Sequence, residues 1–174
     1  ANEFLRQPLY DSIKLTTGTQ AVGTLGEFFT TPKGQSSKTI LDTNITTAGQ
    51  LPYAEARVIG LRLHAVARTV TAPITVGDLN GILACTSLTL KKEDRVILEV
   101  PSFMIPSGYG LNGFASTTAS ATTISTANNG EPHRSNFFEL LSSEQFLQRD
   151  RLQVTLNTNV AFTTTADLYL YVVL

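Results

Sequence analysis

The residues of this chain best suited to chemistry are two histidines, His64 and His133, and one cysteine, Cys85. His64 shares one face of an alternating segment with Arg62 and Arg68, and neighbouring positive charge lowers the pKa of an imidazole. His133 follows a proline in a polar stretch. No motif places a base beside Cys85, and a buried cysteine behaves as a small apolar residue. We therefore predict that the chain is not an enzyme.

Cofactor and metal motifs are also missing from the sequence. Zinc has no ligand set of the usual spacing, and Gly108-Tyr109-Gly110 is not followed by the strand-to-helix unit of a phosphate-binding loop. We predict no cofactor and no metal, although the sequence leaves open a weak calcium site built from loop carbonyls. Asn44-Ile45-Thr46 matches the glycosylation pattern, which matters only in a secreted protein.

The composition restricts the class of protein further. The chain has 174 residues, enough for one domain, but only 16% are charged, compared with about a quarter in typical soluble domains. Either neighbouring subunits cover much of the surface, or hydroxyl groups make it polar. The 13 basic residues are scattered among 14 acidic ones, which does not favour nucleic acid as a partner. The first residues lack the pattern of a secretory signal, so we expect synthesis in the cytoplasm.

Alternating apolar and polar residues dominate the elements that must position any site. Clear examples are 56–70, 95–100 and 167–174, and turn residues separate such runs. Asn80-Gly81 predicts a hairpin turn followed by a strand over Ile82 to Leu90. The one predicted helix covers Asn136 to Asp150, where apolar residues recur at spacings of three and four. The pattern predicts an all-β fold, a single jelly-roll sandwich or barrel of about eight antiparallel strands with one short helix.

The strand phases also predict a core. On one face of the alternating segment we expect Ile59, Leu61 and Leu63 to point inward. The residues predicted to be buried in the core are Leu61, Leu63, Leu98, Leu156, Leu170 and Val172.

The first eleven residues show no clean period. We divide the chain into an N-terminal arm, 1–11, and a jelly-roll domain, 12–174. The arm carries the predicted subunit-interface residues, Phe4, Leu5, Leu9 and Tyr10. Because nothing local would bury them, we expect the arm to contact a neighbouring copy in a homo-oligomer, most simply a dimer. The alternative is a frayed terminus.

The segments Arg57 to Thr69 (RVIGLRLHAVART) and Ala166 to Leu174 (ADLYLYVVL), with the apolar arm and the low charge, resemble a known family. It comprises the small major capsid proteins, single jelly rolls, of tailless icosahedral, membrane-containing phages of Thermus. The resemblance implies a structural capsid protein located in the virion. It also implies a second, larger capsid protein as partner, an internal viral membrane nearby and no small-molecule substrate.

A second function stays open at this point. A jelly-roll carbohydrate- or receptor-binding module of a phage would use aromatic and polar side chains on a loop or sheet face. Tyr53, Phe103 and Tyr109 could serve in such a site, but the chain has no tryptophan to stack on a sugar ring. A metal-dependent enzyme of the cupin type needs clustered histidines, which the sequence lacks.

Overall fold

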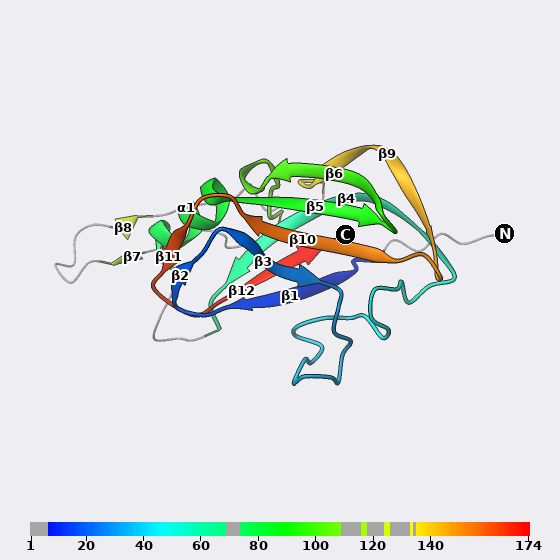
Figure 1. The fold of residues 1–174 in the computed structure, drawn as a ribbon, viewed down its shortest axis with the longest axis horizontal. Coiled ribbons are helices and arrows are strands. Elements are labelled where there is room, and N and C mark those ends of the chain that lie inside the picture. Colours follow the sequence, from blue (N-terminus) through cyan, green and yellow to red (C-terminus); the bar gives the residue numbers. More distant parts are fainter. Residues whose placement is uncertain (1–6, 69–73, 109–115, 118–123, 126–132, 134) are drawn as a thin grey trace.

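Two four-stranded antiparallel sheets pack face to face in a computed structural model that describes residues 7–68, 74–108, 116–117, 124–125, 133 and 135–174 (Figure 1). The first sheet has the order β1-β12-β4-β9, and the second has the order β3-β10-β5-β6. The eight strands are β1 (Tyr10–Leu15), β3 (Gly23–Phe28), β4 (Glu55–Val66), β5 (Thr86–Lys92), β6 (Arg95–Pro101), β9 (Phe138–Leu147), β10 (Leu152–Thr158) and β12 (Leu168–Val173).

The pairing of these eight strands is nested. The first pairs with the eighth, the second with the seventh, the third with the sixth and the fourth with the fifth. Such an order arises when one long antiparallel ribbon is wrapped so that its strands alternate between two sheets. The predicted all-β sandwich is confirmed, and the jelly roll stays our interpretation of this strand order.

Short elements gather at one end of the sandwich. They are β2 (Gly18–Gln20), which pairs with β11 (Phe162–Thr164), the helix α1 (Val76–Cys85) and the 3-10 turn η1 (Ser102–Met104). The two-residue strands β7 (Ser116–Thr117) and β8 (Ile124–Ser125) lie beyond α1 at this end (Figure 1). Among the described helices, none is long and apolar enough to cross a membrane.

The predicted core is largely confirmed. Five of the six predicted residues are buried, and Leu98 is partly buried against the same cluster. Leu98 is less covered because β6 is the edge strand of its sheet, and the pairing of β5 with β6 shifts register between Leu90 and Lys91.

A bulge changes the phase of β4. The pairing of β4 with β9 shifts register between Val58 and Gly60, so Val58 is buried while Ile59, predicted to point inward, is exposed. Beyond the bulge the inward set continues through Leu61 and Leu63, as predicted. A Cβ atom at Gly60 would lie 2.4 Å from the carbonyl oxygen of Phe138, so this position requires glycine.

The helix predicted over Asn136 to Asp150 is wrong, because this segment forms β9. Val58 is opposite Glu144 and Gly60 is opposite Glu139, so the residues 140–143 all lie across from Ile59. This bulge buries Leu140 and leaves Leu141 fully exposed. Because Leu140 and Leu141 are adjacent, the apolar residues of this segment recur at spacings of three and four, although the segment is a strand and not a helix.

The hairpin predicted at Asn80-Gly81 is also wrong, because these residues lie inside α1. Thr75 caps the helix: its hydroxyl accepts from the Asp78 amide at 3.1 Å, and the Asp78 carboxylate accepts from the Thr75 amide at 3.3 Å. This capping box and the buried pair Leu79 and Ile82 favour a helix over a turn. The following strand accordingly starts at Thr86 rather than at Ile82.

Candidate functional site

The structure describes two of the four predicted interface residues, Leu9 and Tyr10. Leu9 is only 4% exposed, and its backbone pairs with Leu174 through hydrogen bonds of 3.1 and 2.8 Å, which extends the pairing of β1 with β12. Tyr10 begins β1. Backbone pairing thus holds the chain from Leu9 onward, and the division into an arm, 1–11, and a domain, 12–174, stays a prediction. Phe4 and Leu5 lie outside the described residues.

The root of the N-terminal segment is held by a residue that sequence reasoning had set aside. The Asn44 side chain donates to the Pro8 carbonyl at 2.8 Å and accepts from the Tyr10 amide at 2.9 Å. Both the oxygen and the nitrogen of the Asn44 side chain, the amide of the glycosylation-like motif, are thus hydrogen-bonded within the chain. Tyr53 adds a hydrogen bond from its hydroxyl to the Gln7 side chain at 2.6 Å. We call this hydrogen-bonded region, which includes Gln7, Pro8, Tyr10, Asn44 and Tyr53, the root of the arm.

The long connection between β3 and β4, residues 29–54, folds against the outer face of the first sheet. The Tyr10 hydroxyl donates to the Ile40 carbonyl at 2.5 Å, and the Tyr171 hydroxyl donates to the Leu41 carbonyl at 2.6 Å. Lys38, which belongs to this connection, forms an ion pair of 2.6 Å with the buried carboxylate of Asp11 in β1. This region is a rigid patch that leaves the Ile40 and Leu41 side chains exposed.

Arg68 is the centre of that patch. Its guanidinium lies 3.8 Å above the Tyr169 ring, pairs with Asp42 at 2.7 Å and donates to the Tyr171 hydroxyl. Burial alone would raise the pKa of Asp42, but hydrogen bonds from Thr39 and Arg68 outweigh it and lower that pKa. Burial, together with Tyr171 and Asp42, raises the pKa of Tyr10. These charges therefore hold the loop in place and do not form an acid–base pair.

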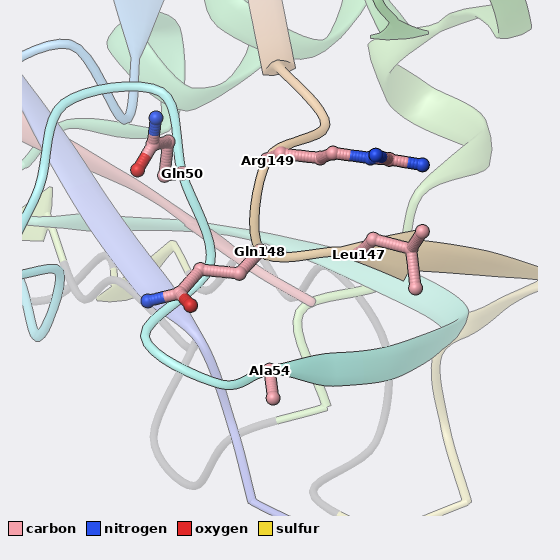
Figure 2. Close-up of a pocket in the computed structure, with 5 residues that line it drawn as sticks. All are labelled: Gln50, Ala54, Leu147, Gln148 and Arg149. Carbon is pink, nitrogen blue, oxygen red and sulfur yellow. The ribbon is translucent and has the colours of Figure 1, made fainter.

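A pocket of about 480 Å³ lies beside the root of the arm, at the end of the sandwich away from α1. Gln50 and Ala54 line it from the β3–β4 connection, Leu147 lines it from the end of β9, and Gln148 and Arg149 line it from the turn between β9 and β10 (Figure 2). The side chains of Gln148 and Arg149 leave the turn in opposite directions (Figure 2). These five residues offer amide and guanidinium donors but no carboxylate, imidazole or thiol.

The structure does not bring the histidines and the cysteine together. Burial lowers the pKa of His64, which lies in β4. His133 is exposed, and Cys85 ends α1, where its carbonyl accepts from the Asn159 amide at 2.8 Å. Within the part of the chain that the structure describes, no group of three or more histidine, cysteine or acidic residues is placed to hold a metal ion.

Large apolar side chains are exposed at several places. The described residues include ten of them: Val22, Ile40, Leu41, Tyr53, Ile59, Val96, Phe103, Met104, Leu141 and Val160. From this set, the sequence predicted only Tyr53 and Phe103 as candidates for a sugar site. The structure does not bring these two residues together. Phe103 is in η1 near α1, whereas Tyr53 is at the root of the arm. The strand pattern could not identify the other exposed residues, because several lie in turns or bulges.

Comparisons with known proteins add no family to this description: no family model, no curated protein and no solved structure matches the chain.

Proposed function

We propose that this chain is a structural subunit of a viral capsid. It assembles with copies of itself, most simply as a dimer, and with a larger capsid protein into an icosahedral shell. The observation that carries the proposal is a surface on which ten large apolar side chains of the described residues are exposed. Only 16% of the residues in the whole chain are charged. Such a surface favours contact with neighbouring protein.

The root of the N-terminal segment also supports assembly. Asn44 and Tyr53 fix the point where the chain leaves the domain, and Phe4 and Leu5 lie beyond that point. A segment that starts from a rigid root loses less freedom when its apolar residues dock on a neighbour than a segment that is loose throughout. We propose Phe4 and Leu5 as contacts to a neighbouring subunit. The larger partner, the location in the virion and the nearby membrane rest on the family resemblance.

The proposal is tested on virus particles purified from a culture of the source. Mass spectrometry of the purified particles should find this chain among the most abundant proteins, and electron microscopy should show antibody against it on intact shells. Particles that contain the chain only in traces, or antibody confined to a fibre or spike, would contradict a role as shell subunit.

The pocket supports a second candidate, a carbohydrate- or receptor-binding module. Gln50, Gln148 and Arg149 offer the hydrogen-bond donors that a sugar hydroxyl or carboxylate needs, and Tyr53 lies nearby in the sequence. A glycan array probed with the intact chain and with Arg149→Ala separates the two candidates. Selective glycan binding that Arg149→Ala removes would favour the binding module, and uniform background would favour the capsid subunit.

A further inference from the structure

The end of the second sheet beside α1 carries almost no charge. The stretches 15–26, 69–90, 100–130 and 152–166 contain a single charged residue, Asp78. Asp78 is buried, and its carboxylate accepts hydrogen bonds from the backbone and the hydroxyl of Thr165 at 2.7 and 2.6 Å. This residue therefore contributes no exposed charge to the surface.

The strand register brings the ends of the four strands of the second sheet together. Gly23 pairs with Thr158, Thr158 pairs with Thr86, and Ser87 pairs with Pro101. The ends of β3, β10, β5 and β6 therefore lie in one row, with neighbouring strands about 4.8 Å apart. Figure 1 shows α1, β2 and β11 grouped at this same end.

Four large apolar side chains project just beyond that row. Val22 precedes β3 and is 67% exposed, Val160 follows β10 and is 59% exposed, and Phe103 in η1 is 62% exposed. Met104, next to Phe103, is about half exposed. We call this surface the uncharged end face and define it by Val22, Phe103, Met104 and Val160.

Among the described residues near this end, Glu99 of β6 is exposed two residues before Pro101, whereas the charges on the other sheet are paired. Lys14 and Asp167 form an ion pair of 2.7 Å, and the Lys14 partnership, followed by the Thr17 amide, lowers the pKa of Asp167 to about 2. Arg68 is paired with Asp42. The four described residues that define the uncharged end face thus offer a partner apolar side chains and no charge.

We propose that the uncharged end face is the surface through which two copies of this chain associate about a two-fold axis. In such an interface each residue near the axis faces its own equivalent, so like charges there repel one another. An uncharged apolar face avoids this repulsion, whereas an anionic lipid surface or a charged protein would find nothing complementary on it. The inference rests on the proposed self-association and adds where the contact is made.

The test compares two lysine substitutions in the full-length chain. Phe103→Lys places a charge on the uncharged end face. Leu141→Lys places the same charge on a fully exposed leucine in the bulge of β9, which lies outside this face. Sedimentation velocity over a range of concentrations measures the dimer Kd of each variant, and thermal unfolding followed by circular dichroism shows that both remain folded.

Phe103→Lys is expected to weaken the dimer by about tenfold or more, because the charge enters the interface twice, whereas Leu141→Lys is expected to change the Kd by less than about twofold. Dimers that persist unchanged in Phe103→Lys would overturn the proposed location while leaving self-association intact. A wild-type chain that stays monomeric would overturn both. Binding of a monomeric chain to phosphatidylcholine vesicles that Phe103→Lys abolishes would assign the face to lipid and overturn the proposal.

Discussion

At the end of the sandwich where β5 turns into β6, ion pairs join the two sheets, whereas at the α1 end neutral hydrogen bonds and a helix cap close the structure. Lys92 of β5 lies 3.1 Å from Asp150 and 3.9 Å from Glu144, and Arg95 of β6 also pairs with Glu144. At the opposite end, the Thr86 hydroxyl lies 2.6 Å from both the Ile82 carbonyl and the Ser102 hydroxyl.

This difference indicates that the surfaces of the two ends have different roles. Charges at the β5–β6 end are engaged within the chain, so they close the gap between the edge strands β6 and β9 and discourage pairing with another sheet. At the α1 end the Thr86 and Ser102 hydroxyls and the buried Asp78 carboxylate are satisfied by hydrogen bonds within the chain, while Phe103 and Val160 stay exposed. The α1 end is therefore the one suited to bury apolar surface against another protein.

The largest expected effect tests whether packing or charge stabilises the β5–β6 end. Phe146 of β9 is fully buried there, with the Lys92 ammonium 5.3 Å from its ring. Phe146→Ala should lower the free energy of unfolding by about 3–5 kcal/mol in urea denaturation, because it leaves a cavity. Leu141→Ala, at a fully exposed position of the same strand, should change it by less than about 0.5 kcal/mol. Equal losses would mean that Leu141 is packed and the bulge in β9 is misplaced.

The next effect concerns the closure of the α1 end. Asp78→Ala removes the capping box and leaves the Thr165 amide without its acceptor, so we expect a loss of about 2 kcal/mol in the same measurement. Asn80→Ala changes an exposed position of the same helix and should cost less than about 0.5 kcal/mol. If Asp78→Ala were as mild as Asn80→Ala, the cap would not be what closes this end.

A smaller effect separates the two ends by their response to salt. Lys92→Met keeps the apolar stem over Phe146 but removes the charge that meets Asp150 and Glu144. The melting temperature should fall, and the difference from the wild type should shrink in about 1 M salt, because salt screens partly exposed ion pairs. Asp78→Ala should show no such dependence. A salt-independent loss in Lys92→Met would indicate packing instead.

The smallest effect is local and follows pH. The Leu147 amide donates to the Asp150 carboxylate at 2.9 Å, and this bond, followed by the Lys92 partnership, lowers the pKa of Asp150. Because the folded pKa is lower than the ordinary value of 3.8, the stabilisation is present above that pH and is lost as pH falls through the folded pKa. Hydrogen exchange at Leu147 should therefore lose protection in acid, and Asp150→Asn should lack this change. Unchanged protection in the wild type would contradict the role of Asp150.

The sequence predicted the parts of the fold in which strand period and burial agree. Leu168 to Val173 alternates cleanly and forms β12 in the centre of its sheet. The errors fall where long-range pairing decides the local structure. A bulge opposite Ile59 made β9 look helical, and the cap formed by Thr75 and Asp78 turned an Asn-Gly pair into helix interior.

The candidate site was less accessible to sequence reasoning. Leu9 has no local period, yet it is buried because its backbone pairs with the distant Leu174. The uncharged end face combines residues from three connections, so only the strand register could bring Val22, Phe103 and Val160 together. The lack of charge in these connections was visible in the sequence, but their common location was not.

The most direct test of the account is sedimentation velocity of the unaltered chain at about 50 mM and about 500 mM salt. Association through the uncharged end face predicts a dimer or larger oligomer whose Kd changes by less than about twofold between the two conditions, because no ion pair is screened on binding. A chain that is monomeric at every concentration would contradict the proposed assembly. A dimer that dissociates as salt rises would place the contact on the charged end instead.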